Sequence, residues 1–159
     1  MRILLAVVVI TLLCSCSSDD SPKQFVYDVG VEFSIKDSQG NDLLNPENEN
    51  TLNSSEIKLF YVVNGAVEEV YDGNMDYPRN YVIYDYAPVS EYRISVFLNN
   101  ADTEAQPITY IQWNATDTDT LRSEIYRRNN LVKIKTLWLN NELIWSDEDG
   151  TEPYFELVK

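Results

Sequence analysis

The chain has 159 residues, with 26 acidic and 12 basic side chains, no histidine and only two cysteines, and its net charge is −14. Phosphate backbones repel such a charge, so nucleic-acid binding is disfavoured. The lack of histidine excludes Ser-His-Asp and Cys-His catalysis as well as zinc sites that depend on imidazole. The length suits a single domain.

The N-terminus predicts an export signal. Met1-Arg2 precedes an apolar run over residues 3–13 that is broken only by Thr11. A membrane span needs about 20 apolar residues, so this shorter run is interpreted as the hydrophobic region of a secretory signal. We expect the signal to cover residues 1–15.

The signal ends in Leu13-Cys14-Ser15-Cys16, which resembles a bacterial lipobox. Small Ser15 directly precedes Cys16 and apolar Leu13 stands three residues before it, whereas the bulky Leu13 fits poorly next to a cleavage at Cys14. Cys16 is therefore the expected lipidation site, and residues 16–24 would form a lipidated tether. An ordinary cleaved signal with two incidental cysteines is the alternative. Lipidation of Cys16 would leave no thiol for a disulfide, a nucleophile or a metal.

Period-two alternation of apolar residues predicts one half-buried strand over residues 25–36, followed by a turn at residues 37–41. Residues 42–55 lack such a pattern and are expected to form an exposed loop. The next two β-rich runs, residues 57–63 and 66–71, flank Asn64-Gly65. That dipeptide supplies both positive-φ positions of a type I′ turn, so it predicts a tight hairpin.

Further strands are predicted at residues 81–86, 92–98 and 108–113, with a weaker one at residues 121–126. Residues 131–139 and 142–145 predict a second hairpin around Asn140-Asn141, and residues 154–158 add a last strand. No segment has the helical period over a useful length. The pattern predicts an all-β domain over residues 25–159, a single antiparallel β-sandwich of about eight strands, immunoglobulin-like or transthyretin-like. A small barrel is the alternative.

Tyrosine is the first candidate for a binding role. The chain has eleven Tyr, five Phe and three Trp residues, and several tyrosines fall in one short stretch. Exposed rings there would stack on a glycan or a peptide. The alternative is that tyrosine serves only as a good strand residue. The candidate ligand-binding aromatics are Tyr77, Tyr81, Tyr84 and Tyr86.

Two acidic loops carry oxygen ligands of the kind that Ca²⁺ prefers, although such loops are more often plain turns. The candidate ligands are Asp117, Asp119, Asp147 and Asp149. No other metal and no cofactor is expected. Asp119-Thr120-Leu121 also resembles the site at which Bacteroidetes O-glycosylate exported proteins, which makes Thr120 a candidate for modification.

Several segments together are similar to a group of small Bacteroidetes cell-envelope lipoproteins. They are residues 33–37 and 40–46, Tyr110 to Asn114, and residues 137–145. Ser17-Ser18-Asp19-Asp20 resembles the serines and acids that follow the lipid cysteine in surface-exposed members. The resemblance implies an exported β-domain, anchored by lipid in the outer membrane at the cell surface. It implies no catalytic residue and no ligand.

Three functions are compatible with these features. The first is a non-enzymatic binding or adhesion module that takes a glycan or a peptide. The second is a structural or accessory subunit that docks on an outer-membrane protein. The third is a glycoside hydrolase with two carboxylates, which is less favoured because such enzymes usually need a larger cleft-bearing scaffold.

Overall fold

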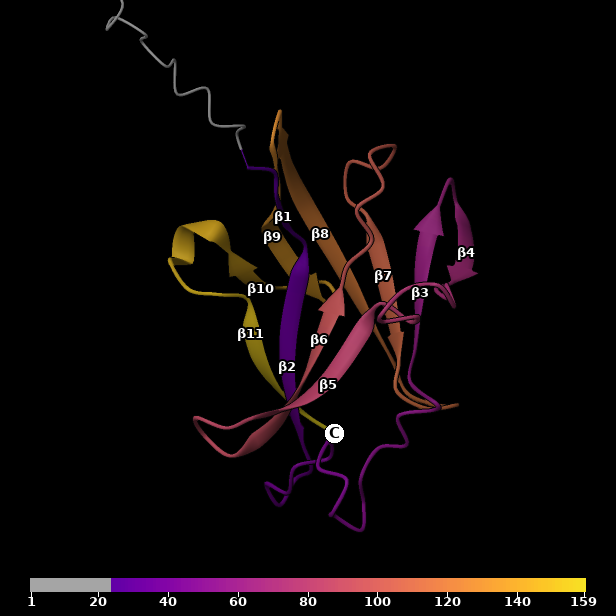
Figure 1. Cartoon of the computed structure of the whole chain (residues 1–159), viewed down its shortest axis with the longest axis vertical. Coiled ribbons are helices and arrows are strands. Elements are labelled where there is room, and N and C mark those ends of the chain that lie inside the picture. The colour runs from indigo at the N-terminus through magenta and orange to yellow at the C-terminus, as the bar shows by residue number, and fades with distance from the viewer. Residues whose placement is uncertain (1–23) are drawn as a thin grey trace, which may run out of the picture.

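The computed structural model describes residues 24–159 and shows an all-β protein of eleven strands in two sheets (Figure 1). The predicted signal, Cys16 and most of the tether lie outside the described residues. A single 3₁₀ turn, Asp147–Asp149, is the one helical element between residues 24 and 159. In this part of the chain, no helix is long and apolar enough to cross a membrane.

The larger sheet has seven strands in the order β1-β9-β8-β7-β3-β4, and β10 pairs with the second half of β9. All of its pairings are antiparallel except that of β1 with β9. Its strands are β1 (Val26–Asp28), β3 (Lys58–Val63), β4 (Ala66–Glu69), β7 (Ile108–Gln112), β8 (Thr118–Arg128), β9 (Leu131–Leu139) and β10 (Glu142–Ser146).

The smaller sheet has the order β11-β2-β6-β5. Its strands are β2 (Gly30–Lys36), β5 (Tyr81–Tyr86), β6 (Glu91–Phe97) and β11 (Tyr154–Val158). The last strand, β11, runs parallel to β2. The prediction of a purely antiparallel sandwich of about eight strands is therefore wrong in detail. Both sheets are mixed, because the two parallel pairs join segments far apart in the chain, where no turn connects them.

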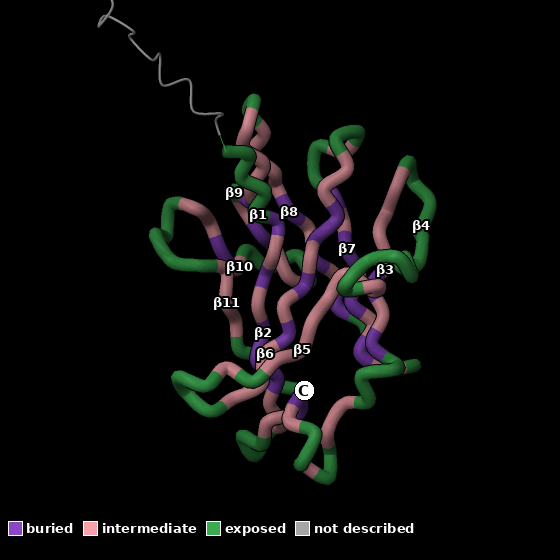
Figure 2. The backbone as a smooth tube through the Cα atoms, in the orientation of Figure 1, coloured by how far each residue is buried: buried purple, intermediate pink, exposed green. Residues whose placement is uncertain are grey.

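One hydrophobic core lies between the two sheets. Phe33 of β2 meets Trp113, just after β7, edge to face with ring centroids 6.5 Å apart. Figure 2 shows the buried positions, in purple, along the strands of both sheets. Buried members from the smaller sheet are Val31, Phe33, Ile35, Ile94 and Val96, and from the larger sheet Leu59, Ile111, Leu121, Ile134 and Leu137. The arrangement is therefore sandwich-like.

Residues 25–36, predicted as one strand, form two strands that belong to different sheets. At Val29 the chain leaves β1 in the larger sheet and enters β2 in the smaller one. Val29 is 2% exposed, and its carbonyl accepts a hydrogen bond from the Leu98 amide at 2.9 Å. The crossing does not interrupt the alternation of apolar residues in the sequence. The burial that this alternation predicts begins only at Val29, because all three residues of β1 are exposed, so the prediction of a half-buried strand is wrong for residues 25–28.

The predicted exposed loop is also partly wrong. Within residues 42–55, Leu43 and Leu44 are buried in the core, and the Leu43 amide donates to the carbonyl of Ile35 at 2.7 Å. These two leucines cover the end of β2. Burial of two adjacent apolar side chains in a polar loop leaves no periodic pattern to detect.

Both predicted hairpins are confirmed. Asn64 and Gly65 have φ values of 51° and 80°, and Asn140 and Asn141 have values of 49° and 73°. The dipeptides thus take the left-handed conformation that matches the strand twist. Strands β5 and β11 begin and end at the predicted residues, and the weak prediction at residues 121–126 is part of the longer β8.

Candidate functional site

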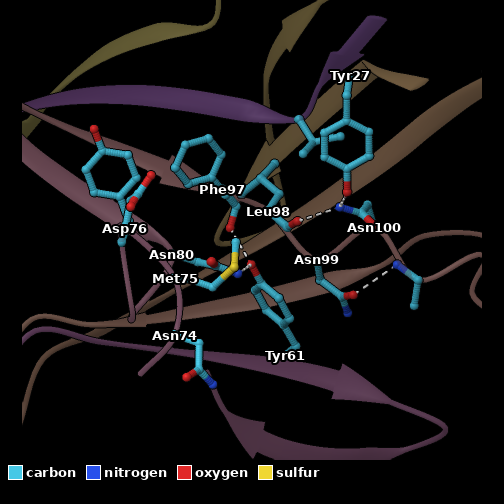
Figure 3. A pocket seen from close by; sticks show the side chains of 13 residues that line it. Tyr27, Tyr61, Asn74, Met75, Asp76, Asn80, Phe97, Leu98, Asn99 and Asn100 are labelled. Carbon is cyan, nitrogen blue, oxygen red and sulfur yellow. Dashed lines mark hydrogen bonds between the residues drawn. The ribbon is translucent and has the colours of Figure 1, made fainter. Parts of the chain in front are cut away.

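A cavity of about 720 Å³ opens at one end of the two sheets and takes its walls from both (Figure 3). It is lined by the end of β1, by β3, by the end of β6 with the segment after it, and by the loop between β4 and β5. The lining residues are Tyr27, Val29, Tyr61, Asn74, Met75, Asp76, Tyr77, Asn80, Phe97, Leu98, Asn99, Asn100 and Ala101.

Tyr61 of β3 forms a fixed wall of the cavity. Its hydroxyl donates to the carbonyl oxygen of Phe97 at 2.6 Å and accepts from Nδ2 of Asn80 at 3.1 Å. Burial raises the pKa of Tyr61 to about 12. The phenol therefore stays neutral at physiological pH, and its two hydrogen bonds tie the larger sheet to the end of the smaller one.

Asn99 holds the segment after β6 in place. It is 2% exposed, and its Nδ2 donates to the carbonyls of Val62 at 2.8 Å and Ile108 at 3.1 Å. Its backbone amide donates to Oγ1 of Thr109 at 2.8 Å, and its Oδ1 accepts from the amide of Ala101 at 3.1 Å. All polar groups of the side chain are therefore used to build the cavity, and the wall is preorganised.

The mouth of the cavity is aromatic and exposed. The Tyr77 ring, 46% exposed, stacks on Phe97 with centroids 6.3 Å apart and an interplanar angle of 24°. Tyr27 lies on another side of the mouth, where its hydroxyl bonds to Nδ2 of Asn100 (Figure 3). Met75 adds an exposed thioether. Flat rings therefore border a space that is open to solvent.

Several oxygen atoms of the lining are not committed to the protein itself. Within residues 24–159, no hydrogen bond uses Oδ1 of Asn80, Oδ1 of Asn100, the hydroxyl of Tyr77 or the carboxylate of Asp76. Among residues 24–159, Asp76 is the only carboxylate in the lining. The cavity thus combines ring faces with mostly neutral acceptors, and it lacks the pair of acids that glycoside hydrolysis requires.

The four predicted aromatic residues do not share one surface. Tyr77 lies at the mouth of the cavity, and it also lines a smaller hollow together with Tyr81. Tyr81 packs against the core and donates its hydroxyl to the carbonyl of Ser54 at 2.6 Å. Burial raises the pKa of Tyr81. Tyr84 and Tyr86 project from the opposite face of β5, because neighbours on a strand alternate in direction.

Tyr84 and Tyr86 belong to a packed cluster on the outer face of the smaller sheet. The guanidinium of Arg93 lies 3.6 Å from the ring centroid of Tyr86 and 3.9 Å from that of Tyr154. Arg93 pairs with Glu32 at 3.3 Å, and the Tyr84 hydroxyl donates to Oε1 of Glu32 at 2.5 Å. Burial and this carboxylate raise the pKa of Tyr84 to about 12. The groups satisfy one another, so we assign the cluster a packing role.

A lysine lies between the first pair of predicted calcium ligands. Nζ of Lys159 is 2.9 Å from Oδ1 of Asp117 and 2.6 Å from Oδ2 of Asp119. Burial alone would raise the pKa of Asp119, but hydrogen bonds from Lys159, Asn140 and the Trp113 indole outweigh it, and the pKa is lowered. The ammonium group takes the place between the carboxylates that a metal ion would need.

The second pair of predicted ligands is also engaged within the protein. Asp147 pairs with Nζ of Lys133 at 3.0 Å, and Asp149 accepts from the amide of Ser146 at 2.8 Å as part of a capping box. Among the described residues, no group of three or more acids, histidines or cysteines is arranged to hold a metal ion. The structure therefore adds no support for calcium at either loop.

Thr120 lies within β8, opposite Tyr110 of β7. Its neighbours Asp119 and Leu121 are buried, so its half-exposed side chain is on the outer face of the larger sheet. O-glycosylation of Thr120 remains a prediction, and mass spectrometry of the native protein tests it. An unmodified Thr120 would contradict it.

Sequence reasoning missed the asparagines of the cavity. Asn74 and Asn80 come from the segment between β4 and β5, and Asn99 and Asn100 from the segment after β6, so their meeting depends on the fold. A scan against protein-family models and searches of curated proteins and of solved structures found no match. The function is therefore inferred from the geometry of this cavity.

Proposed function

We propose that the protein is a lipid-anchored binding module of the bacterial cell envelope and that the cavity at the end of the sheets is its ligand site. The observation that carries this proposal is a preformed cavity of about 720 Å³ with aromatic rings at its mouth and uncommitted oxygen atoms in its lining. Small-molecule sites in proteins typically have volumes of about 300–1,000 Å³ and a few convergent polar groups on an apolar lining.

A neutral glycan is the ligand class that fits this lining best. The C–H face of a sugar ring packs against the exposed faces of Tyr77 and Tyr27, and its hydroxyls donate to Oδ1 of Asn80 and Asn100. A peptide is the alternative ligand. Extended peptides commonly bind by adding to a free strand edge, whereas loops and strand ends form most of this mouth, so the glycan is favoured.

The anchor and its location rest on the sequence. The lipobox at Cys16 and the Ser17-Ser18-Asp19-Asp20 segment support a Bacteroidetes-type lipoprotein in the outer membrane that faces the cell surface. We also assign the domain to the immunoglobulin-like or transthyretin-like sandwiches. Two sheets around one core support this assignment, and the two parallel pairings are departures from it.

A glycan array followed by calorimetric titration of the hits tests the ligand site. Tyr77→Ala should weaken binding at least about tenfold, because it removes an exposed stacking surface worth more than about 1.4 kcal/mol. Tyr86→Ala is the matched control, since Tyr86 packs on Arg93 away from the cavity. The Tyr86→Ala variant should bind the glycan with the affinity of the wild type. An array without hits, or equal affinities for wild type and Tyr77→Ala, would contradict the proposal.

A row of side chains across the larger sheet favours a second candidate function, that of an accessory subunit in an outer-membrane complex. The strand register places Arg122 in the middle of this row, and the rest is apolar. The apolar members are Val67, Val62, Ile108, Trp138 and Leu143. Arg122 stacks on Trp138, and within residues 24–159 its guanidinium forms no ion pair, so an acidic partner surface would complement it.

Photo-cross-linking from position 143 in native membranes should capture such a partner, and a strictly monomeric result would contradict this role.

A further inference from the structure

The first residues of the domain form an exposed apolar patch, Phe25-Val26-Tyr27. These side chains are 57%, 46% and 55% exposed. The rings of Phe25 and Tyr27 stack with centroids 6.3 Å apart and an interplanar angle of 25°. A strand of a soluble sheet usually exposes one side and buries the other, whereas all of β1 is exposed. Clustered exposed apolar side chains mark a surface that contacts another apolar phase.

The patch lies where the tether joins the domain. The amide of Val26 donates to the carbonyl of Asn130 at 2.8 Å, and Nδ2 of Asn130 donates to the carbonyl of Gln24 at 2.9 Å. Both bonds fix the start of β1 beside the tip of the β8–β9 hairpin. In Figure 1 this end of the molecule lies away from the C-terminus and from the loop between β5 and β6.

A cation lies at the same edge of the larger sheet. Arg128, exposed at the end of β8, stands opposite Leu131, which in turn pairs with Val26 in register, so Arg128 shares a face with Val26. Phe25 and Tyr27 alternate to the other side of β1, and the edge of the sheet presents the rings and the guanidinium from its two faces. Within residues 24–159 the Arg128 guanidinium forms no salt bridge. Aromatic rings and arginine together match the interface of a lipid bilayer, where rings sit at headgroup depth and a guanidinium pairs with phosphate.

The reach of the tether limits where this patch can be. Eight residues lie between Cys16 and Phe25. An extended chain spans at most about 3.3–3.6 Å per residue, so the nine steps from Cys16 to Phe25 cover at most about 32 Å. A lipid on Cys16 would thus hold the patch near the headgroups at a high effective concentration, and even a weak contact would then be occupied.

We infer that Phe25, Val26, Tyr27 and Arg128 seat the domain on the headgroup region of the membrane that anchors it. The contact orients the domain: the loop between β5 and β6 points away from the bilayer, and Tyr27 brings the mouth of the cavity to the membrane-proximal side. This inference rests on the anchor part of the proposed function. It shares Tyr27 with the proposed glycan site, so the membrane contact is tested at Phe25 and the glycan site at Tyr77.

Depth-dependent quenching tests the inference. The full chain is expressed with its own signal, purified from membranes and reconstituted into vesicles with brominated acyl chains. A Phe25→Trp variant places a fluorophore in the patch, and Val89→Trp, at a residue that is 59% exposed in the loop between β5 and β6, is the matched control. Both sites are exposed, so neither substitution disturbs the core. We expect the added fluorescence of Phe25→Trp to be quenched at least about twofold more than that of Val89→Trp.

Vesicle flotation separates the possible failures. Wild type should float and Cys16→Ser should not. Flotation with equal quenching of both tryptophans would overturn the seated orientation and leave the anchor intact. Failure of the wild type to float would overturn the anchor together with this inference, while glycan binding by the domain in solution would still be measured separately.

Discussion

Replacing Asp119 by alanine would remove the acceptor at the centre of a buried polar cluster. Asp119 is 7% exposed and accepts from the Trp113 indole at 2.7 Å and from Lys159 at 2.6 Å. Trp113 is fully buried, so its indole N–H would lose the only acceptor that it has in the described part of the chain, at a cost of about 1–3 kcal/mol. Loss of the charge-assisted bond to Lys159 adds about 1.5–3 kcal/mol. We expect the free energy of unfolding to fall by about 3–5 kcal/mol in total.

Urea denaturation followed by tryptophan fluorescence measures this change. Asp117→Ala is the matched control, because it removes the other carboxylate that contacts Lys159, and that carboxylate is half-exposed and accepts nothing from Trp113. Its cost should stay below about 1 kcal/mol, as for other surface pairs. A cost below about 1 kcal/mol for Asp119→Ala, or equal costs for both variants, would refute the role assigned to the buried acceptor.

Four further predictions concern stability. The lowered pKa of Asp119 means that the ionised carboxylate stabilises the fold fully above its ordinary pKa of 3.8 and progressively less below it. The difference in unfolding free energy between wild type and Asp119→Ala should therefore narrow from about pH 4 to pH 2 in denaturation curves. A constant difference would contradict this prediction. Asn99→Ala leaves two strand carbonyls without their donor and should cost about 2–3 kcal/mol in thermal unfolding; an unchanged midpoint would show that the wall is not held in this way. Arg122→Met removes a buried Nε that lacks an acceptor among the described residues, so the free energy of unfolding should stay unchanged or rise by up to about 1 kcal/mol. A clear loss of stability would mean that this Nε has a hydrogen-bond acceptor after all. Gly65→Ala should cost about 1–2 kcal/mol, because Gly65 has a φ of 80°, and a neutral result would mean that the turn relaxes.

Local patterns predicted the elements that local forces determine. Asn64-Gly65 and Asn140-Asn141 form the turns of both hairpins, because their left-handed conformations suit these residue types. The alternating runs at β5 and β11 likewise marked strands with correct ends. Sequence alone was sufficient wherever neighbours along the chain decide the conformation.

Long-range features were not predictable in this way. The crossing at Val29 and the burial of Leu43 and Leu44 depend on which distant strands cover them. The site has the same origin. Tyr77 was a candidate, but its partner Phe97 and the asparagines of the wall come from segments that meet only in the fold. Alternation could have separated Tyr81 from Tyr84 and Tyr86, since odd and even positions of one strand face opposite sides.

The crossing at Val29 also determines how the domain would respond to mechanical load. A force on the tether first acts on β1, a three-residue edge strand whose ladder is short, and then on β2. Strand β2 is central in its sheet, with β11 on one side and β6 on the other, so both neighbours must slide before it moves. Detachment of β1 would free three residues, with a contour length of about 10 Å, and would take Tyr27 out of the cavity lining while the walls at Tyr61 and Asn99 stay in place. Single-molecule pulling from the N-terminus should therefore show a small early extension before the main rupture, and a single rupture without it would show that β1 and β2 yield together.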